Sequence, residues 1–338
     1  MTTLGVGGPA RWLVVAQDAH ELLAAVRFAR EQRAPFFVLG GGSNVLVSDK
    51  GFPGVVIRFG GRGEIEMQRQ NGTGTVSADA GVEWDSLVLF ALQKNLGGVE
   101  CLVGIPGSVG GTPVQNVGAY GQEVSRTITR VCAVDLEAEE EVELTPAECG
   151  FSYRQSIFNT TKRGRYAITR VDYGLSPDAT PHIEYRDLKA HFAGKPKPTL
   201  LETASAVRAI RASKGMLLSA SDPDSRSAGS FFKNPIVPLE MVAKVAAVKG
   251  CKAEEVPQFP AGAAGKTKLS AAWLIELSGF QRGFVMGNVG LSTKHVLAIV
   301  NRGGATAAEV VALRDAVVDA VRAKTGIVLE QEPVLVGF

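Results

Sequence analysis

The spacing of apolar side chains predicts two clear helices, one near each end of the chain. Residues 18–32 are typical of an amphipathic helix, because apolar positions recur three and four apart behind Asp18, a residue type that caps helices. A longer helix is predicted in TAAEVVALRDAVVDAVRAKTG, where Thr306 and Glu309 form a capping box and Gly326 provides the stop. Both predictions depend only on local pattern and on capping residues.

Short apolar runs separated by glycine predict strands between these helices. Residues 35–40, PFFVLG, have the length and composition of a buried strand, and short strands alternate with glycine turns over residues 54–81. Residues 131–146, VCAVDLEAEEEVELTP, predict a hairpin whose acidic tip at residues 139–141 is expected to be a solvated turn. The last run, residues 327–338, is again strand-like.

The pattern of apolar and glycine residues changes near residue 200. The segment AGKPKPTL, residues 193–200, is predicted to be an extended linker, because its alternating Lys and Pro favour extended backbone. Helical periodicity dominates after it, as in TASAVRAIRASK and TKLSAAWLIELSG, whereas glycine turns and strands dominate before it. The pattern predicts an α+β protein with a larger first part and a smaller second part.

The composition is that of a globular protein without a nucleic-acid-binding surface. The 338 residues are 45% apolar and 21% charged, with a formal net charge of +2 and no dense basic stripe. No apolar run approaches the ~20 residues of a membrane span, and the N-terminus lacks the basic and apolar regions of a signal peptide. The four cysteines form no CxxC pair, so we expect no metal site and a cytoplasmic protein with reduced thiols.

Two well-known nucleotide-binding motifs are absent from the sequence. The segment GAAGKT, residues 262–267, lacks the first glycine of a P-loop, because Pro260 stands five positions before Gly265. No GxGxxG pattern opens a helix after a predicted strand, so the signature of a Rossmann dinucleotide site is also missing. A nucleotide or cofactor site must therefore come from other glycine-rich segments.

The segment GGGSN lies between two strand-like runs and has the chemistry of an anion site. Consecutive glycines can turn several backbone N–H groups toward one point, and Ser43 and Asn44 add side-chain donors. A triple glycine can equally be a structural bend, so this segment alone does not decide the matter.

A second such loop is the stretch GIPGSVGGTPVQNVGAYG, Gly104 to Gly121, which holds six glycines and no charge. Its two prolines restrict the backbone, while its glycines allow a ligand to approach closely. Two rigid glycine loops in a strand-rich region suit a large ligand with a pyrophosphate and a flat ring, such as FAD; two tight turns without a ligand are the alternative. The cofactor-binding candidates are Gly40, Gly41, Gly42, Ser43, Asn44, Gly104, Pro106, Gly107, Ser108, Gly110 and Gly118.

Six motifs in one order identify a family resemblance. They are GGGSNVLVSD, GIPGSVGGTPVQNVGAYG, FSYRQSIF, SAGSFFKNP, KLSAAWLIE and VLEQEPV. Together they closely resemble the UDP-N-acetylenolpyruvoylglucosamine reductases, flavoenzymes of bacterial peptidoglycan precursor synthesis, over nearly the whole chain. Each motif singly is moderate support, and their common order makes the resemblance strong.

The resemblance implies a FAD-binding fold of the vanillyl-alcohol-oxidase (PCMH) type plus a smaller C-terminal α+β substrate-binding domain. It implies residues 1–195 as the FAD-binding region with two subdomains, 196–326 as the substrate-binding domain, and 327–338 as a C-terminal strand that could return to the FAD region. It further implies FAD, NADPH as reductant, and reduction of an enolpyruvyl ether on a UDP-sugar to UDP-N-acetylmuramate. We expect non-covalent FAD, since no histidine lies near residues 40–44, and a monomer without nucleic-acid or membrane partners.

Three residues match the catalytic positions of the family. Ser230 in AGSFFKNP matches the serine proton donor, Glu332 in LEQEP matches the glutamate beside the substrate, and Arg154 in SYRQSIF matches an arginine beside flavin and substrate. The chemistry needs such groups, because negative charge builds on the substrate carboxylate and the adjacent carbon must then receive a proton. Lys233 is a candidate cation near Ser230. Each residue alone could instead be a cap, an exposed strand residue or a surface ion-pair member.

Further positions match substrate contacts of the family, and some depart from its usual pattern. His295 and Arg282 stand where Gln and Lys are common, Gly111-Thr112 where Ala-Ala is common, and residues 214–230 form a longer segment than usual. The Gly-Thr pair should loosen packing under the flavin. An oxidase of the same flavin fold is the alternative function, but it would lack GSFFKNP and LEQEP. The substrate-binding candidates are Tyr153, Tyr185, Lys214, Asn234, Arg282 and His295.

Overall fold

The computed structural model describes residues 2–70 and 73–338, which divide into two compact units. The first unit consists of residues 9–42 and 51–213. The second unit consists of residues 2–8, 43–50 and 214–338. Two short N-terminal segments therefore fold with the C-terminal part of the chain, which the sequence pattern did not indicate. The functional ranges 1–195, 196–326 and 327–338 stay predictions.

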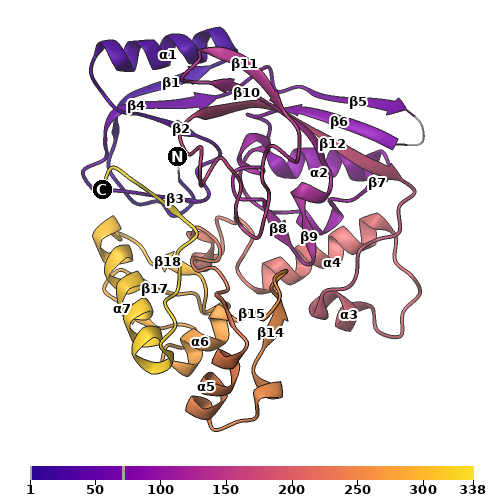
Figure 1. Cartoon of the computed structure of the whole chain (residues 1–338), viewed down its shortest axis with the longest axis vertical. Coiled ribbons are helices and arrows are strands. Elements are labelled where there is room, and N and C mark those ends of the chain that lie inside the picture. Colours follow the sequence, from indigo (N-terminus) through magenta and orange to yellow (C-terminus); the bar gives the residue numbers. More distant parts are fainter. Residues whose placement is uncertain (1, 71–72) are drawn as a thin grey trace. The chain divides into compact units, whose positions relative to one another are not determined.

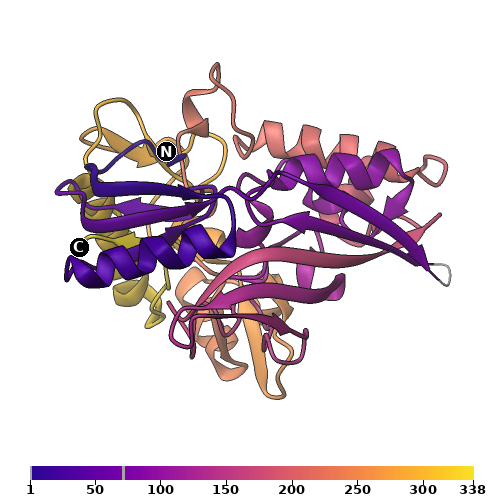
Figure 2. The ribbon, with the colours of Figure 1, turned by 90° about the horizontal axis from the view of Figure 1, so that it is seen from above.

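The first unit opens with a small parallel sheet covered by one helix (Figures 1 and 2). Its strand order is β1 (Ala10–Ala16), β4 (Phe52–Phe59), β2 (Phe36–Leu39). Helix α1 (Ala19–Glu31) buries Leu22, Ala25, Val26 and Ala29 in one apolar cluster with Val55 and Ile57 of β4. The Asp18 carboxylate accepts a hydrogen bond of 2.8 Å from the backbone N–H of Glu21. The helix predicted for residues 18–32 and its cap are confirmed.

A larger antiparallel sheet follows in the same unit. Its order is β11 (Glu140–Leu144), β10 (Ile128–Asp135), β12 (Tyr166–Pro177), β6 (Thr73–Asp79), β5 (Ile65–Gln70), and β7 (Leu96–Gly97) pairs with the end of β12. Strands β10 and β11 form the hairpin predicted from the sequence. Glu139 at its tip forms ion pairs with Arg27 and Arg30 of α1. This residue therefore links the hairpin to the neighbouring helix and is not only part of a solvated turn.

Helices α2 (Trp84–Gln93), α3 (Arg186–Phe192) and α4 (Leu200–Ser213) complete the first unit. Residues 196–199, within the predicted linker, have no helix or strand, yet α4 packs on the 3-10 helix η1 (Glu100–Leu102) of the same unit. Thr112 is buried, and its hydroxyl lies 2.8 Å from that of the fully buried Tyr173. Thr112 therefore gives a buried phenol its hydrogen-bond partner, which alanine would not.

The second unit holds three short sheets and three main helices. The sheets are β13 (Ile236–Pro238)–β15 (Lys266–Leu269)–β14 (Gln258–Pro260), β16 (Val285–Met286)–β17 (Val289–Leu291)–β18 (Ile299–Asn301), and the parallel pair β19 (Val334–Val336)–β3 (Val45–Val47). The helices are α5 (Glu240–Lys249), α6 (Ala271–Leu277) and α7 (Ala307–Thr325), of which α7 lies against β17 and β18 (Figure 1).

Local signals in this unit were interpreted correctly from the sequence. Helix α7 begins at the capping box of Thr306 and Glu309 and ends at Gly326, whose φ is 74°. The segment GAAGKT runs from the turn after β14 into β15, which begins at Lys266, so it does not open a helix as a P-loop would. No helix within residues 2–70 and 73–338 is long and apolar enough to cross a membrane.

Candidate active site

The two glycine-rich loops of the first unit touch one another through bare backbone. A Cβ atom placed on Gly41 would lie 2.6 Å from Gly107 Cα and 3.0 Å from the backbone nitrogen of Ser108. A Cβ on Gly40 would lie 3.2 Å from Ser108 Oγ. These distances leave almost no room for side chains, which is why glycine is needed here. The structure thus brings the loop at residues 40–42 together with that at residues 107–108, as expected for one cofactor site.

The second loop is fixed in place by its own backbone hydrogen bonds. The N–H of Gly104 donates to Asp85 Oδ1 at 2.6 Å, and the N–H of Gly110 donates to the carbonyl of Ala80 at 3.0 Å. A Cβ on Gly110 would come within 2.5 Å of Ala80 Cβ. The loop is therefore rigid and lacks side chains at its glycines, so a flat dinucleotide such as FAD could approach its backbone closely.

Gly118 lies beside the catalytic candidate Arg154 in the same unit. Arg154 Nη2 donates a hydrogen bond of 2.8 Å to the carbonyl of Gly118, and its guanidinium carbon lies 5.5 Å from the centre of the Tyr153 ring. The φ of Arg154 is 57°, which a residue with a side chain adopts only at some cost. Backbone strain at a charged residue is typical of functional sites. Gly118 thus accepts a hydrogen bond that positions Arg154.

The substrate-binding candidate Tyr185 contacts Tyr120, a residue that was not among the candidates predicted from the sequence. Its ring contacts that of Tyr120 edge-to-face, with the two centroids 5.2 Å apart. Burial raises the pKa of Tyr120 to about 12, while the positive charge of buried Arg211 acts in the opposite direction. Tyr120 also has a positive φ of 49°. Its position inside GAYG, between two glycines of the quoted loop, was the available signal; Arg211 had none.

In the second unit, the segments that carry Ser230 and Glu332 run side by side. The N–H of Glu332 donates to the carbonyl of Phe231 at 2.9 Å, and the N–H of Lys233 donates to the carbonyl of Glu330 at 2.8 Å. Asn44 joins them, since its side-chain amide donates to the carbonyl of Glu332 at 3.2 Å. Two catalytic candidates that are a hundred residues apart in the chain, and one cofactor candidate, therefore share one place in this unit.

Two other residues of this region carry structural roles as well. Lys233 Nζ lies 3.3 Å from Glu330 Oε2, so part of its charge is compensated by an exposed carboxylate. Asn234 Oδ1 accepts a hydrogen bond of 2.9 Å from the N–H of Ala271, the first residue of α6. Asn234 thus fixes the start of a helix, whatever its contact with substrate.

His295 lies in a positive environment made by two other substrate-binding candidates. Burial is the main cause that lowers its pKa to about 4, and the charges of Lys214 and Arg282 lower it further. The imidazole is consequently neutral at physiological pH. Two cations therefore lie near enough to an uncharged hydrogen-bonding ring to act on its pKa, an arrangement suited to a phosphate-bearing ligand.

Replacement of His295 by glutamine should reduce the loss of the free energy of unfolding as the pH falls into the acid range. Between the ordinary histidine pKa of about 6.5 and the folded-state value of about 4, the unfolded chain takes up a proton that the folded chain does not. This contribution to stability is complete above pH 6.5 and is lost as the pH falls. The wild type should lose up to about 1.4 kcal/mol per pH unit more than the variant in this window.

Chemical denaturation followed by tryptophan fluorescence from pH 4.5 to 8.5 measures this difference. Above pH 7 the two curves should run parallel, which serves as the internal control. Parallel curves over the whole range would contradict the buried, neutral state of His295.

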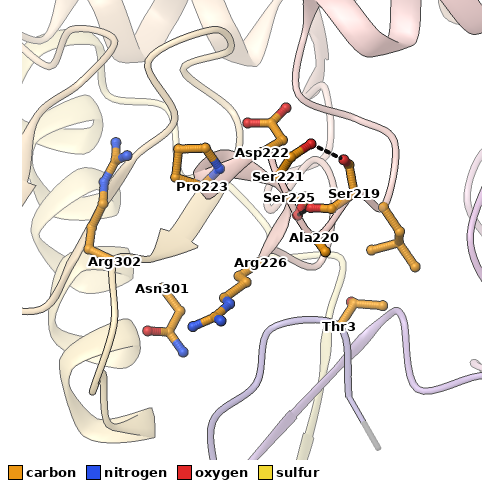
Figure 3. Close-up of a pocket in the computed structure, with 11 residues that line it drawn as sticks. Thr3, Ser219, Ala220, Ser221, Asp222, Pro223, Ser225, Arg226, Asn301 and Arg302 are labelled. Atoms are coloured by element: carbon orange, nitrogen blue, oxygen red, sulfur yellow. Dashed lines mark hydrogen bonds between the residues drawn. The ribbon is translucent and has the colours of Figure 1, made fainter.

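A cavity of about 600 Å³ lies elsewhere in the second unit, around residues 218–226 (Figure 3). Some of its polar groups are hydrogen-bonded. Arg302 Nη1 donates to Asp224 at 2.8 Å, and the hydroxyls of Ser219 and Ser221 lie 2.9 Å apart. Arg302 Nε, in contrast, is buried without a hydrogen-bond partner among the described residues. None of the site residues predicted from the sequence lines the cavity.

Comparisons with known proteins agree with this geometry. Residues 10–144 match the FAD binding domain, and residues 222–336 match the UDP-N-acetylenolpyruvoylglucosamine reductase C-terminal domain. The chain is 44% identical to UDP-N-acetylenolpyruvoylglucosamine reductase of Thermobifida fusca, covering 99% of this chain and 95% of that protein. The chain belongs to the UDP-N-acetylenolpyruvoylglucosamine reductase family. The resemblance inferred from the six motifs is confirmed.

Other members of this family give the same result. The reductase of Streptomyces coelicolor is 44% identical over 100% of this chain and 88% of its own length. The crystal structure of UDP-N-acetylenolpyruvylglucosamine reductase from Thermus caldophilus superposes with a TM-score of 0.66 at 29% identity, covering 99% of this chain and 95% of that chain. The protein is thus an oxidoreductase with a FAD-binding domain and a C-terminal domain of this reductase family.

Proposed function

We propose that this enzyme uses NADPH to reduce the enolpyruvyl ether of UDP-N-acetylglucosamine-enolpyruvate to UDP-N-acetylmuramate, a step of peptidoglycan precursor synthesis. The observation that carries the proposal is the hydrogen-bonded pairing of the Ser230 segment with the Glu332 segment. This pairing lies in the region that matches the reductase C-terminal domain. We also propose that FAD is bound non-covalently and that the enzyme acts in the cytoplasm as a monomer.

Bound FAD would supply the redox chemistry, accepting a hydride from NADPH and passing it to the terminal vinyl carbon of the substrate. Gly41 and Gly107 would hold it, because the close approach of their loops leaves no space for a side chain on Gly41. Gly110 would keep the second loop in place through its hydrogen bond to the carbonyl of Ala80. The reaction balances when the carbon next to the carboxylate receives one proton, so that the double bond becomes a saturated lactyl ether.

The residues of this chain would then stabilise charge and supply the proton. Arg154 would hold the substrate carboxylate as negative charge builds on it, since a guanidinium stays charged and can bind both oxygens; one such donor is worth about 3 kcal/mol of barrier. Ser230 would deliver the proton to carbon. A hydroxyl is a weak acid, so it needs the basicity of the enolate and a nearby cation, for which Lys233 is the candidate.

Lys214, Arg282 and His295 would contact the nucleotide part of the substrate, and Tyr185 would close on it. Two cations next to a neutral imidazole suit a pyrophosphate flanked by uncharged polar groups. Glu332 would orient the substrate or share in proton movement, because its backbone is bonded to the Ser230 segment.

Anaerobic rapid mixing tests the proposed function. NADPH should bleach the visible flavin absorbance of the purified enzyme, and the enolpyruvyl nucleotide should restore it without oxygen. An oxidase of the same fold would recover its colour with oxygen but not with the nucleotide. Failure of the nucleotide to restore the colour would therefore reject the proposal.

A further inference from the structure

Two loops of the first unit that lack extended secondary structure meet through their tyrosines. Tyr120 lies between the two-residue strands β8 (Gly118–Ala119) and β9 (Gln122–Glu123), and residues 179–184 before Tyr185 form neither helix nor strand. The two rings nevertheless make a defined edge-to-face contact at 5.2 Å. Such a contact between irregular segments requires that something else hold both backbones.

The buried carboxylate of Glu100 is bonded to both segments. Glu100 is 1% exposed and accepts hydrogen bonds from Gln122 Nε2 at 2.8 Å, from the N–H of His182 at 3.0 Å and from the N–H of Gly98 at 2.8 Å. Gln122 comes two residues after Tyr120, and His182 comes three residues before Tyr185. One side chain thus joins the Tyr120 loop to the Tyr185 loop.

Neighbouring groups complete the same junction. The carbonyl of His182 accepts a hydrogen bond from Cys101 Sγ at 3.1 Å, and burial raises the pKa of this thiol, which keeps it protonated as a donor. The side-chain oxygen of Gln122 accepts from the N–H of Cys101 at 2.7 Å. A Cβ on Gly121 would lie 2.6 Å from His182 Nε2, so the missing side chain of Gly121 makes room for the His182 ring.

A carboxylate is well suited to this place, because it offers only acceptors. Within the described part of the chain, all three of its donors are neutral N–H groups, and burial of a charge is tolerated only when such bonds satisfy it. Both loop donors, Gln122 Nε2 and the N–H of His182, bond the same oxygen, Oε1, whereas the N–H of Gly98 bonds Oε2. Glutamine can therefore keep both loop bonds by turning its amide nitrogen toward Gly98, whereas alanine removes both acceptor oxygens.

We propose that Glu100 is a positioning residue that fixes the Tyr120 and Tyr185 loops relative to one another, so that Tyr185 is held ready to contact the nucleotide sugar. The inference rests on the proposed function only for the role of Tyr185 toward substrate. The link between the two loops follows from the hydrogen bonds of Glu100 to Gln122 and His182 and can be tested without catalysis.

Hydrogen–deuterium exchange tests the junction with the Glu100→Ala variant, in which both loops lose their shared acceptor. Peptides that contain residues 118–122 and 179–186 should both exchange about tenfold faster than in the wild type, the effect of losing roughly one hydrogen bond in each loop. Tyr173→Phe is the matched control, because it removes one buried hydrogen bond from the same unit without touching either loop. Unchanged exchange in either peptide of Glu100→Ala, or equal acceleration in Tyr173→Phe, would overturn the proposal.

Steady-state and rapid kinetics test the link to substrate. The KM for the enolpyruvyl nucleotide should rise about tenfold in Glu100→Ala, while the rate of flavin reduction by NADPH and the KM of Tyr173→Phe stay at the wild-type values. Faster exchange with an unchanged KM would overturn the positioning role. If the wild type does not turn over the nucleotide at all, the proposed function fails, and the exchange experiment still decides whether Glu100 joins the loops.

Discussion

Replacing Ser230 with alanine should leave flavin reduction by NADPH intact and slow reoxidation by the enolpyruvyl nucleotide by about 10²–10⁴-fold. The reason is that only the second half-reaction needs a proton delivered to carbon. Among the residues that the structure describes, none forms a hydrogen bond with the Ser230 hydroxyl, whereas the next residue is fixed through its backbone N–H to Leu297. The segment should therefore keep its conformation when the hydroxyl is removed. Stopped-flow absorbance measures the two half-reactions separately.

Ser227→Ala is the matched control for this prediction. Ser227 Oγ accepts a hydrogen bond of 3.2 Å from the N–H of Gly229, so this variant disturbs the same segment while leaving the proposed proton donor in place. We expect its reoxidation rate to stay within about tenfold of the wild type, the effect of one lost hydrogen bond. If both half-reactions slow equally in Ser230→Ala, or if the two variants behave alike, Ser230 has a structural role and the assignment as proton donor is wrong.

The sequence predicted correctly those helix ends and turns that are determined by neighbouring residues in the chain. The Asp18 cap, the Thr306–Glu309 capping box and the left-handed Gly326 each act within a few residues, so the pattern identifies the ends of α1 and α7. The β10–β11 hairpin follows from alternation and a short polar turn. The tie from Glu139 to α1 could not be foreseen, because it joins residues more than a hundred positions apart.

The parts that could not be predicted are those made by distant pairing. Nothing in the run around Val45 indicates that it will pair with Val334 in a parallel ladder, or that Leu4 will be buried in the C-terminal core. The apolar pattern states that a strand will be buried, but not which partner buries it. For this reason the sequence placed Asn44 among the cofactor contacts without showing that its amide bonds the backbone of Glu332.

In the candidate site, too, some residues were predicted from the sequence and others became apparent only in the structure. Ser230, Glu332 and Arg154 were found because their motifs match those of the family, and the structure brings the segments of the first two together. Glu100 was missed, because a single glutamate carries no period or spacing that marks it, and Tyr120 was missed although it lies between two glycines in GAYG. Their roles become visible only through ring contact and buried hydrogen bonds, which are properties of the folded chain.

The second large effect is expected for Gly41→Ala, which should weaken FAD binding by about a hundredfold or more. The added methyl carbon would lie 2.6 Å from Gly107 Cα and 2.8 Å from its carbonyl carbon, and both are backbone atoms that cannot rotate away. The two glycine loops would have to separate, and displacement of binding groups by about 1 Å costs a factor of about 10² in well-fitted sites. Titration of the apoprotein with FAD, followed by flavin fluorescence, measures the change in Kd.

Gly111→Ala is the control, because it adds the same methyl group to the same loop where space exists. Its Cβ would meet only Ser108 Oγ at 3.8 Å, an ordinary contact, and Gly111 lies in the short 3-10 helix η2 (Val109–Gly111), where alanine is well accepted. FAD affinity should therefore stay near the wild-type value in this variant and fall only in Gly41→Ala. Equal affinity in both would mean that the backbone contact between the loops does not shape the cofactor site, and the glycine pattern would need another explanation.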